Sequence, residues 1–343
     1  MDEESRSVRL EIWKGRSVYV TGATGLLGSW LVGELVDAGA NVVALVRDRI
    51  PYSLLYARGL DTKIASVRGE LEDYSIHERI LAEYEVEVVF HLGAQTQVLI
   101  ANRSPLSTFE ANIRGTYMLL EACRHHPLLK SVIVASSDKA YGTADRLPYD
   151  ETTPLRGEHP YDASKSCADL VANSYAKSLG LPVSITRCGN LYGGGDLNFA
   201  RIVPGTIRSV LQNEAPIIRT DGTLRRDYFY VRDAVQAYMV LAERMITEQR
   251  PGDAYNFSSD VPLSVLEITA AILRAMGRED LQPKILGENR GEIPDQWLSA
   301  AKARRELAWE PQFTLEQGLR ETVSWYEEFF RAQRKSAEVV AAH

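Results

Sequence analysis

Tyr161 and Lys165, which stand four residues apart in the sequence, are candidates for proton transfer. Residues at i and i+4 share one face of a helix, so the lysine cation would lie beside the phenol and lower the pKa of its hydroxyl. The phenolate could then act as a general base on an alcohol. Ser137 follows an apolar run upstream, where its hydroxyl could hydrogen-bond the reacting oxygen.

A glycine-rich turn spans residues 22–28, between an apolar strand candidate at 18–21 and a helical pattern at 26–36. Its spacing is GxxGxxG, in which the first glycine permits a tight turn, the second lets backbone amides approach a pyrophosphate, and the third allows close helix–strand packing. An ordinary strand–turn–helix is the alternative, but the flanking elements favour a bound dinucleotide. The expected contact residues are Gly22, Thr24, Gly25, Leu26, Leu27 and Gly28.

The residues after the second strand candidate, 42–46, bear on the choice between NAD and NADP. An acidic side chain there holds the ribose 2′-hydroxyl, whereas an arginine accommodates a 2′-phosphate. Arg47 comes first and Asp48 only one residue later, which slightly favours NADP, although a solvated charge cluster would look the same. Glu70 and Leu71 follow a third strand, where the carboxylate could meet the adenine amine.

The first half of the chain alternates short apolar runs with helical patterns. Continuous Val, Ile and Leu runs without polar alternation are typical of strands buried on both faces, and their alternation with helices predicts a right-handed, doubly wound parallel sheet. Further strands are expected at residues 86–91, 131–136 and 183–187, and long helices at about 106–124 and 163–179. The fold class is therefore α/β and Rossmann-like.

After about Asn190 the pattern becomes irregular, which predicts a smaller mixed α/β substrate lobe at the C-terminal end. We expect residues 12–190 to form the dinucleotide-binding domain, with a returning segment near 228–258. Residues 191–227 and 259–332 would form the lobe. The charged and alanine-rich tail, 333–343, is expected to fray.

Composition excludes several classes of protein. The chain has 343 residues, 45% hydrophobic and 25% charged, and these are globular averages that argue against disorder and fibrous repeats. A net charge of −7 argues against nucleic acid as a partner. Three cysteines without a CxxC pair, and histidines without an HxxxH pair, argue against a disulfide framework and a metal site. The polar N-terminus and the lack of a long apolar run predict a cytoplasmic protein without a membrane span.

The chain resembles the extended short-chain dehydrogenase/reductases, in particular the NAD-dependent nucleotide-sugar epimerases and dehydratases. The matching segments cover residues 15–330 and include TGATGLLG, HLGAQ, NIRGT, SSDKAYG, YDASK, RCGN and RDY. The resemblance implies a retained NAD or NADP that transiently oxidises C4 of a sugar. It also implies cofactor contacts from Leu92, Gly93 and Ala94, and catalysis by Ser137, Tyr161 and Lys165, with the two long helices pairing into a homodimer.

Ser137 is followed by Asp138 and Lys139, which distinguishes dehydratases from epimerases within this family. Oxidation at C4 acidifies the C5 proton, so a base must remove it and an acid must protonate the departing C6 hydroxyl. Asp138 suits the acid role, and Lys139 the base role if it is desolvated enough to be neutral. A 4,6-dehydratase, most similar to the CDP-glucose 4,6-dehydratases, is therefore the favoured prediction. A 4-epimerase, which needs neither group, is the alternative.

The same resemblance places the sugar-nucleotide diphosphate on Asn190, Arg226 and Arg290, because its negative charge needs fixed partners. Asn112 is expected to stabilise a helix bend near the active site, and His91 to pack at a strand end without a catalytic role. Other reactions and a non-enzymatic dinucleotide sensor remain as alternatives, and an intact Tyr161–Lys165 pair argues against the sensor.

Overall fold

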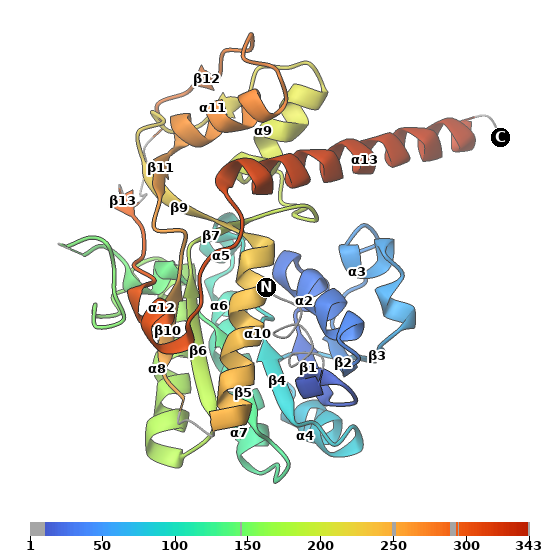
Figure 1. The fold of residues 1–343 in the computed structure, drawn as a ribbon, viewed down its shortest axis with the longest axis vertical. Coiled ribbons are helices and arrows are strands. Elements are labelled where there is room, and N and C mark those ends of the chain that lie inside the picture. The colour runs from blue at the N-terminus through green and yellow to red at the C-terminus, as the bar shows by residue number, and fades with distance from the viewer. Residues whose placement is uncertain (1–10, 145, 249–251, 289–292, 294, 342–343) are drawn as a thin grey trace.

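The computed structural model describes residues 11–144, 146–248, 252–288, 293 and 295–341. Within this part of the chain, seven parallel strands form a central sheet in the order β10-β6-β5-β4-β1-β2-β3 (Figure 1). The order reverses between β1 and β4, and open α/β sheets bind their ligands at such a point. The strands are β1 Ser17–Thr21, β2 Asn41–Val46, β3 Ala65–Arg68, β4 Val88–His91, β5 Ser131–Ala135, β6 Val183–Cys188 and β10 Ala254–Phe257.

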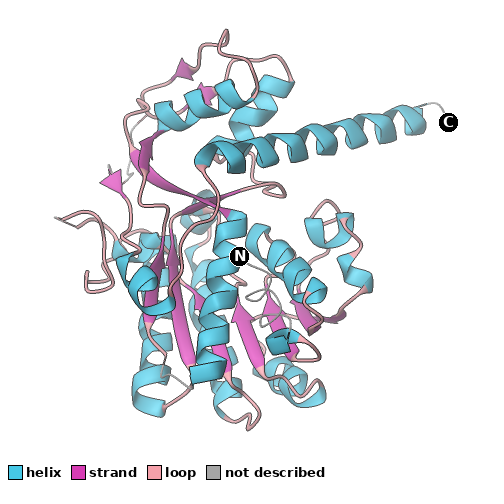
Figure 2. Cartoon of the chain, in the orientation of Figure 1, coloured by secondary structure: helices cyan, strands magenta, loops and turns pink. Residues whose placement is uncertain are grey.

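Helices cover both faces of this sheet (Figure 2). Alternate residues of β1 enter different cores, because successive side chains of a strand point to opposite faces. Val18 and Val20 pack with α2 (Leu26–Asp37) and α10 (Val231–Glu248), whereas Tyr19 packs with the other layer. That second layer consists of α4 Tyr74–Glu83, α7 Gly115–Arg124 and α8 Pro160–Leu179. The predicted doubly wound α/β sheet is confirmed.

The helix expected at 106–124 is divided into three parts. It runs as α6 (Pro105–Phe109), a π-helical turn η2 (Glu110–Arg114) and α7. Asn112 lies buried in the π-helical turn. Single π-helical turns of this kind are frequent at functional sites, because they re-aim side chains without ending the helix. A short helix α5, Val98–Arg103, precedes this run.

The smaller lobe is built around a second sheet, in which β9 pairs with β7, β11 and β13. Helices α9 and α11 pack together above it, and the long α13 runs across the upper part of the molecule (Figure 1). The remaining elements are β7 Asn190–Tyr192, β8 Ile217–Ile218, β9 Arg225–Tyr230, β11 Pro262–Ser264, β12 Lys284–Ile285, β13 Asp295–Gln296, α3 Leu54–Ala57, η1 Leu60–Thr62, η3 Asp138–Tyr141, α9 Ile202–Leu211, α11 Val265–Ala275, α12 Ala301–Leu307 and α13 Leu315–Ala341.

The structure adds detail to two segments of the expected domain division. The returning segment expected at 228–258 divides between the sheets, since β9 belongs to the lobe while α10 and β10 complete the large domain. The described part of the tail expected to fray, 333–341, continues α13 as far as Ala341, and fraying of this end stays a prediction.

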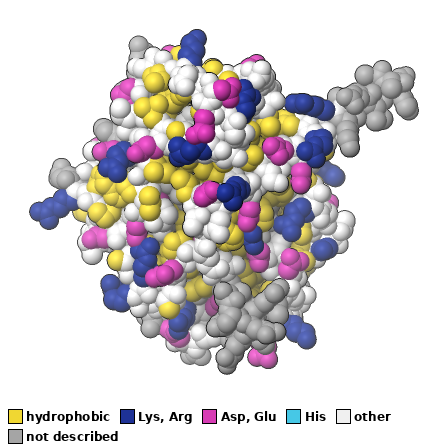
Figure 3. Space-filling view, turned by 45° about the horizontal axis from the view of Figure 1, so that its top comes forward, with side chains coloured by type: hydrophobic (Ala, Val, Ile, Leu, Met, Phe, Trp, Pro, Cys, Tyr) yellow, Lys and Arg dark blue, Asp and Glu magenta, His cyan; other side chains and the backbone are white. Residues whose placement is uncertain are grey.

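Among the described residues, no helix is long and apolar enough to cross a membrane. On the face drawn in Figure 3, Lys and Arg side chains are interspersed with Asp and Glu. The coloured residues of that face therefore form no extended basic surface of the kind that binds a nucleic-acid backbone.

Candidate active site

The residues predicted to do chemistry converge on the carboxyl ends of the central strands. The glycine turn follows β1, Leu92 and Gly93 follow β4, and Ser137 follows β5. Tyr161 enters this edge from the first turn of α8, which packs against β6 and η3. Parallel strands end at one edge of the sheet, so segments far apart in sequence meet there.

The glycine turn lies against its own helix and against the end of β4. Gly22 has φ +73°, and a Cβ there would meet the Gly93 nitrogen at 2.7 Å. A Cβ on Gly28 would meet the Gly22 carbonyl oxygen at 2.1 Å. Among the described residues, no acidic side chain occupies the first turn of α2. The N-cap residue is Gly25, so no N-cap side chain hydrogen-bonds to the amides of this turn. The turn therefore leaves backbone amides of the helix N-terminus available for a pyrophosphate, as a dinucleotide requires.

A buried chain of hydrogen bonds holds the ends of β1 and β4 together. The Thr116 hydroxyl donates to the Asn112 carbonyl oxygen (2.6 Å), so its oxygen accepts from His91 Nε2 (3.0 Å). His91 Nδ1 then accepts from Thr21 (2.9 Å), whose oxygen accepts from the Leu92 and Gly93 amides (3.1 and 3.0 Å). Burial lowers the pKa of His91 to about 3, so the ring is neutral. This assignment agrees with the expected packing role of His91.

Leu71 fills the space between two backbone segments near the glycine turn. A Cβ on Gly93 or Gly115 would meet Leu71 at 3.1 or 2.7 Å. Thr24, Leu26 and Ala94 are half-buried, whereas Glu70 is exposed. Thr24 and Leu26 follow β1, Ala94 follows β4, and Glu70 follows β3, and the contact of these residues with a cofactor stays a prediction.

Arg47 lies just beyond β2 and donates to the Asp48 carboxylate over 2.6 Å, with both side chains exposed. This hydrogen bond and the nearby Glu70 and Glu72 raise the pKa of Arg47. The guanidinium that the sequence analysis assigned to a 2′-phosphate is therefore engaged by an adjacent carboxylate.

Tyr161 and Lys165 occupy one face of α8, as the spacing predicts. Lys165 is 6% exposed, and its Nζ donates to the Ala135 carbonyl oxygen over 2.8 Å at the end of β5. Burial lowers the pKa of Lys165 to about 8, and the nearby Asp169 opposes this shift. Burial also raises the pKa of Tyr161 to about 12, although a hydrogen bond with Ser137 acts in the opposite direction. In the protein alone, desolvation of the phenolate thus outweighs the neighbouring groups that lower the pKa of Tyr161, and the lowering expected from Lys165 together with a bound nicotinamide ring stays a prediction.

Ser137 and Asp138 form a buried pair at the start of η3. The Ser137 hydroxyl donates to Asp138 Oδ1 (3.0 Å) and its oxygen accepts from the Lys139 amide (3.2 Å). Asp138 is 2% exposed, and its Oδ2 has no hydrogen-bond partner among the described residues. Burial raises the pKa of Asp138 despite the opposing effects of Lys139, Ser137 and Arg226. A buried, unpartnered carboxyl oxygen favours the protonated acid that a proton donor needs.

Lys139 extends to a residue that the sequence analysis did not select. Its ammonium donates to Oε1 of Gln296, which lies in β13 of the lobe. Gln296 is fully buried, and its Nε2 donates to the Asp138 carbonyl oxygen (3.0 Å). The contact joins residues 157 positions apart, and no local motif marks Gln296 in the sequence.

Asn112 connects the π-helical turn to the catalytic helix. Its Oδ1 accepts from the Gln95 amide (2.7 Å), and its Nδ2 donates to the Gln95 carbonyl oxygen (3.0 Å) and to Ser164 Oγ (2.8 Å). Ser164 in turn donates to the Tyr161 carbonyl oxygen (2.7 Å). Asn112 thus fixes the backbone around Tyr161, in agreement with the supporting role expected from the sequence.

Two of the three residues predicted to hold a diphosphate lie on paired strands of the lobe, because Asn190 of β7 stands opposite Tyr228 of β9, two residues from Arg226. Asn190 begins β7 and is half-buried. Arg226 is 6% exposed, donates to the Arg225 carbonyl oxygen (2.9 Å), and influences the pKa of Asp138. This places Arg226 close to the proposed acid. Arg290 lies outside the described residues.

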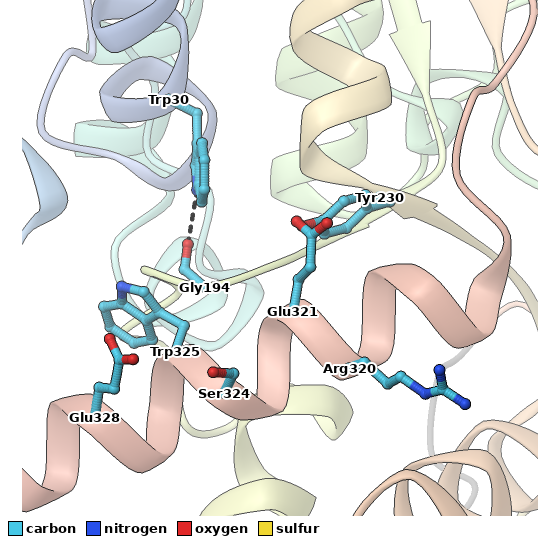
Figure 4. A pocket seen from close by; sticks show the side chains of 8 residues that line it. All are labelled: Trp30, Gly194, Tyr230, Arg320, Glu321, Ser324, Trp325 and Glu328. Carbon is cyan, nitrogen blue, oxygen red and sulfur yellow. Dashed lines mark hydrogen bonds between the residues drawn. The ribbon is translucent and has the colours of Figure 1, made fainter.

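A cavity of about 450 Å³ lies on another part of the molecule (Figure 4). It is bounded by α2, the segment after β7, and α13. Trp30 donates to the Gly194 carbonyl oxygen (2.8 Å) at one side, and Tyr230 donates to Glu321 (2.6 Å) at another. None of the predicted catalytic residues lines it, so it is distinct from the catalytic edge of the sheet.

Comparison with known proteins gives a consistent set of relatives. The family model for GDP-mannose 4,6 dehydratase matches residues 19–322. CDP-glucose 4,6-dehydratase of Salmonella typhimurium is 32% identical over 336 residues, covering 94% of this chain and 93% of the relative. A dTDP-glucose 4,6-dehydratase from Streptomyces venezuelae, solved with NAD, is 27% identical, covers 91% of this chain and 97% of its own, and has a TM-score of 0.80. UDP-glucose 4-epimerase from Thermotoga maritima is 27% identical, with coverages of 92% and 99% and a TM-score of 0.82.

Proposed function

The chain belongs to the GDP-mannose 4,6 dehydratase family, and we propose that it is a nucleotide-sugar 4,6-dehydratase. Such an enzyme converts a nucleoside-diphosphate hexose into the 4-keto-6-deoxyhexose and releases one water. The observation that carries the proposal is the placement of Asp138 and Lys139 beside Ser137 at the carboxyl end of β5. A 4-epimerase has no need of an acid and a base at this position, because its 4-keto intermediate only rotates.

Ser137, Tyr161 and Lys165 would carry out the first half of the reaction. The Tyr161 phenolate would remove the proton of the C4 hydroxyl while Ser137 hydrogen-bonds the same oxygen. With a pKa of about 8, most Lys165 is protonated at neutral pH, so its charge favours the phenolate. Bound NAD or NADP would supply the hydride acceptor at C4, a positive charge near the phenol, and the same hydride for C6.

Asp138 and Lys139 would carry out the elimination. Neutral Lys139 would remove the C5 proton that the C4 ketone acidifies, and Asp138 would give a proton to the C6 hydroxyl as the C6–O bond breaks. The electron pair of the C5–H bond forms the C5–C6 double bond, and water leaves. The proton held on Lys139 then returns to C5 when hydride reaches C6. Burial of Asp138, which raises its pKa, supports its role as the acid.

The cofactor is a nicotinamide dinucleotide, and we propose that NAD binds more tightly than NADP. A 2′-hydroxyl could donate to the Asp48 carboxylate, whereas a 2′-phosphate would be repelled by it and would compete for the Arg47 guanidinium. This proposal differs from the slight preference for NADP expected from the sequence, and it is supported by the hydrogen bond from Arg47 to Asp48. The dissociation constants of NAD and NADP, measured by calorimetry on the same protein, test this assignment.

The proposed substrate is a nucleoside-diphosphate hexose whose diphosphate contacts Asn190 and Arg226, with Arg290 as a further proposed contact. We also propose a homodimer that pairs the helical layer containing α7 and α8. Apolar side chains of this layer are exposed, including Leu106 at 73% and Leu170 at 57%. Sedimentation as a monomer at micromolar concentration would contradict the dimer.

Mass spectrometry of reaction mixtures tests the proposed reaction. The protein would be incubated with CDP-, GDP-, UDP- and dTDP-hexoses, with and without added NAD or NADP. Loss of one water from one of these substrates is the expected result, and it also identifies the nucleotide. An unchanged mass with a new sugar isomer would establish a 4-epimerase instead. In that case Asp138 and Lys139 would be a structural pair.

A further inference from the structure

Gln296 reaches the catalytic residues from the smaller lobe. It lies in the two-residue strand β13, which pairs in parallel with β9 and sets Gln296 opposite Arg226. The side chain is fully buried, although glutamine is a polar residue that is seldom buried without hydrogen-bonding partners. Its partners are both in the segment that carries Asp138 and Lys139.

These two contacts determine the orientation of the Gln296 amide. The Asp138 carbonyl oxygen can only accept, so the group that faces it over 3.0 Å must be the Nε2 donor. The amide oxygen then faces Lys139 and accepts from its Nζ. One side chain therefore holds both the backbone of the proposed acid and the amine of the proposed base.

We propose that Gln296 is a positioning residue that directs the Lys139 amine toward C5 of the sugar and keeps it there during elimination. The inference rests on the proposed dehydratase function. Lysine has a flexible four-carbon stem, so a free amine would sample many rotamers and spend little time at the reacting carbon. A fixed acceptor selects one of them. Because Gln296 belongs to the lobe, this contact couples the position of the lobe to the elimination chemistry.

The segment around Gln296 is anchored without its side chain. The Tyr149 amide donates to the Trp297 carbonyl oxygen (2.9 Å), and the Ser299 amide donates to the Tyr149 carbonyl oxygen (2.8 Å). The Arg225 guanidinium also lies over the Trp297 ring at 4.9 Å. A side chain of similar volume at position 296 should therefore leave the backbone in place, so that the role of the amide can be tested in a folded protein.

Single-turnover experiments on Gln296→Met separate the two halves of the reaction. Oxidation at C4 is followed by the absorbance of the reduced cofactor, and elimination by mass loss and by deuterium taken from D₂O at C5. We expect elimination to slow by about 10–100-fold, since a misplacement of about 1 Å can cost this much, while oxidation changes by less than about 3-fold. Gln212→Met, at an exposed position after α9, is the matched control and should leave both rates unchanged.

Gln296→Glu adds a second measurement, the pH optimum of elimination, which a purely structural role of Gln296 would leave unchanged. The carboxylate retains an acceptor for Lys139 but favours its ammonium form, so the pH optimum of elimination should move upward. Among the described residues, the charged groups that act on Lys139 or its partners include Asp138, Asp162 with His159, and Arg226, and they are the same in both proteins.

Three results would overturn the inference. In Gln296→Met, these are an equal slowing of oxidation and elimination, or an unchanged rate of elimination. In Gln296→Glu, it is a pH optimum of elimination that stays fixed. A matching fall in the melting temperature and in NAD affinity would also assign Gln296 a structural role. If the unmodified protein removes water from none of the nucleotide sugars, the proposed function itself fails and the positioning role fails with it. The assay of the unmodified protein comes first, so a failure of the proposed function is detected before the Gln296 variants are compared.

Discussion

The substitution Gly28→Ala tests whether close packing of the glycine turn against helix α2 holds the turn amides in position to bind a dinucleotide. A Cβ at position 28 would lie 2.1 Å from the Gly22 carbonyl oxygen and 2.9 Å from the Ala23 Cα. The three nearest atoms all belong to the backbone of the turn itself, so the movement of a side chain cannot relieve these contacts. Relief requires the turn and the helix to separate by roughly 1 Å, given that non-bonded heavy atoms prefer about 3.5–4.0 Å.

The size of the effect follows from this displacement. Overpacking of a well-packed site costs about 1–3 kcal/mol, and the same range in binding corresponds to about 5–150-fold in affinity. Because the turn amides that would face the pyrophosphate move with the backbone, we expect the dissociation constant of NAD to rise by this factor. The free energy of unfolding should fall by about 1–3 kcal/mol. Calorimetric titration with NAD and denaturant unfolding measure the two quantities separately.

Gly33→Ala, in the same helix, is the matched control. A Cβ there would meet the Arg58 guanidinium at 3.3 Å and Leu60 Cδ1 at 3.7 Å, and a guanidinium at the end of a flexible side chain can shift. Alanine also favours a helix interior over glycine by up to about 1 kcal/mol, so this variant should be as stable as the unmodified protein or more stable. If a folded Gly28→Ala protein bound NAD as tightly as Gly33→Ala does, the reasoning about the turn would be refuted.

Three further predictions concern the catalytic groups. Tyr161→Phe should abolish turnover of the nucleotide sugar, measured by mass loss, while calorimetric titration still shows NAD binding. Turnover near that of the unmodified protein would show that Tyr161 takes no part in the reaction. Asp138→Asn should slow water loss by about 10²–10⁴-fold and leave C4 oxidation nearly unchanged. Its melting temperature should change little, because the neutral amide has nearly the shape of the protonated carboxyl and its oxygen can still accept from Ser137. The pKa of Lys165 is about 8 in the fold and about 10.4 in an unfolded chain, so the unfolded state binds more protons between these values. The free energy of unfolding should therefore rise with pH across that window by up to about 3 kcal/mol relative to Lys165→Met, and parallel curves for the two proteins would contradict the burial of this amine.

Local patterns in the sequence predicted the central sheet and the elements that carry the catalytic residues. The strand found at Val183–Cys188 had been expected at 183–187, and the helix found at Leu26–Asp37 had been expected at 26–36. Periodic burial and turn chemistry are properties of neighbouring residues, so they can be read without knowing the fold. The spacing of Tyr161 and Lys165 likewise follows from one helix.

Electrostatic properties could not be predicted in the same way. Burial by several elements raises the pKa of Tyr161 to about 12, where proximity to a lysine alone predicted a lower value. The orientation of the neutral His91 ring depends on threonines from β1 and α7. Desolvation is set by everything that surrounds a group, which only the packed chain determines.

By itself, the sequence determined the doubly wound α/β fold, the glycine turn and the order of the catalytic motifs, because each is encoded within a few adjacent residues. Only the tertiary structure brought Arg226 near enough to influence the pKa of Asp138, and only it brought Gln296 to Lys139 across 157 positions. It also decided that Arg47 pairs with Asp48. The pairing of β9 with β13 creates the contact at Gln296, and strand pairing between distant segments has no signature in the residues on either side of it.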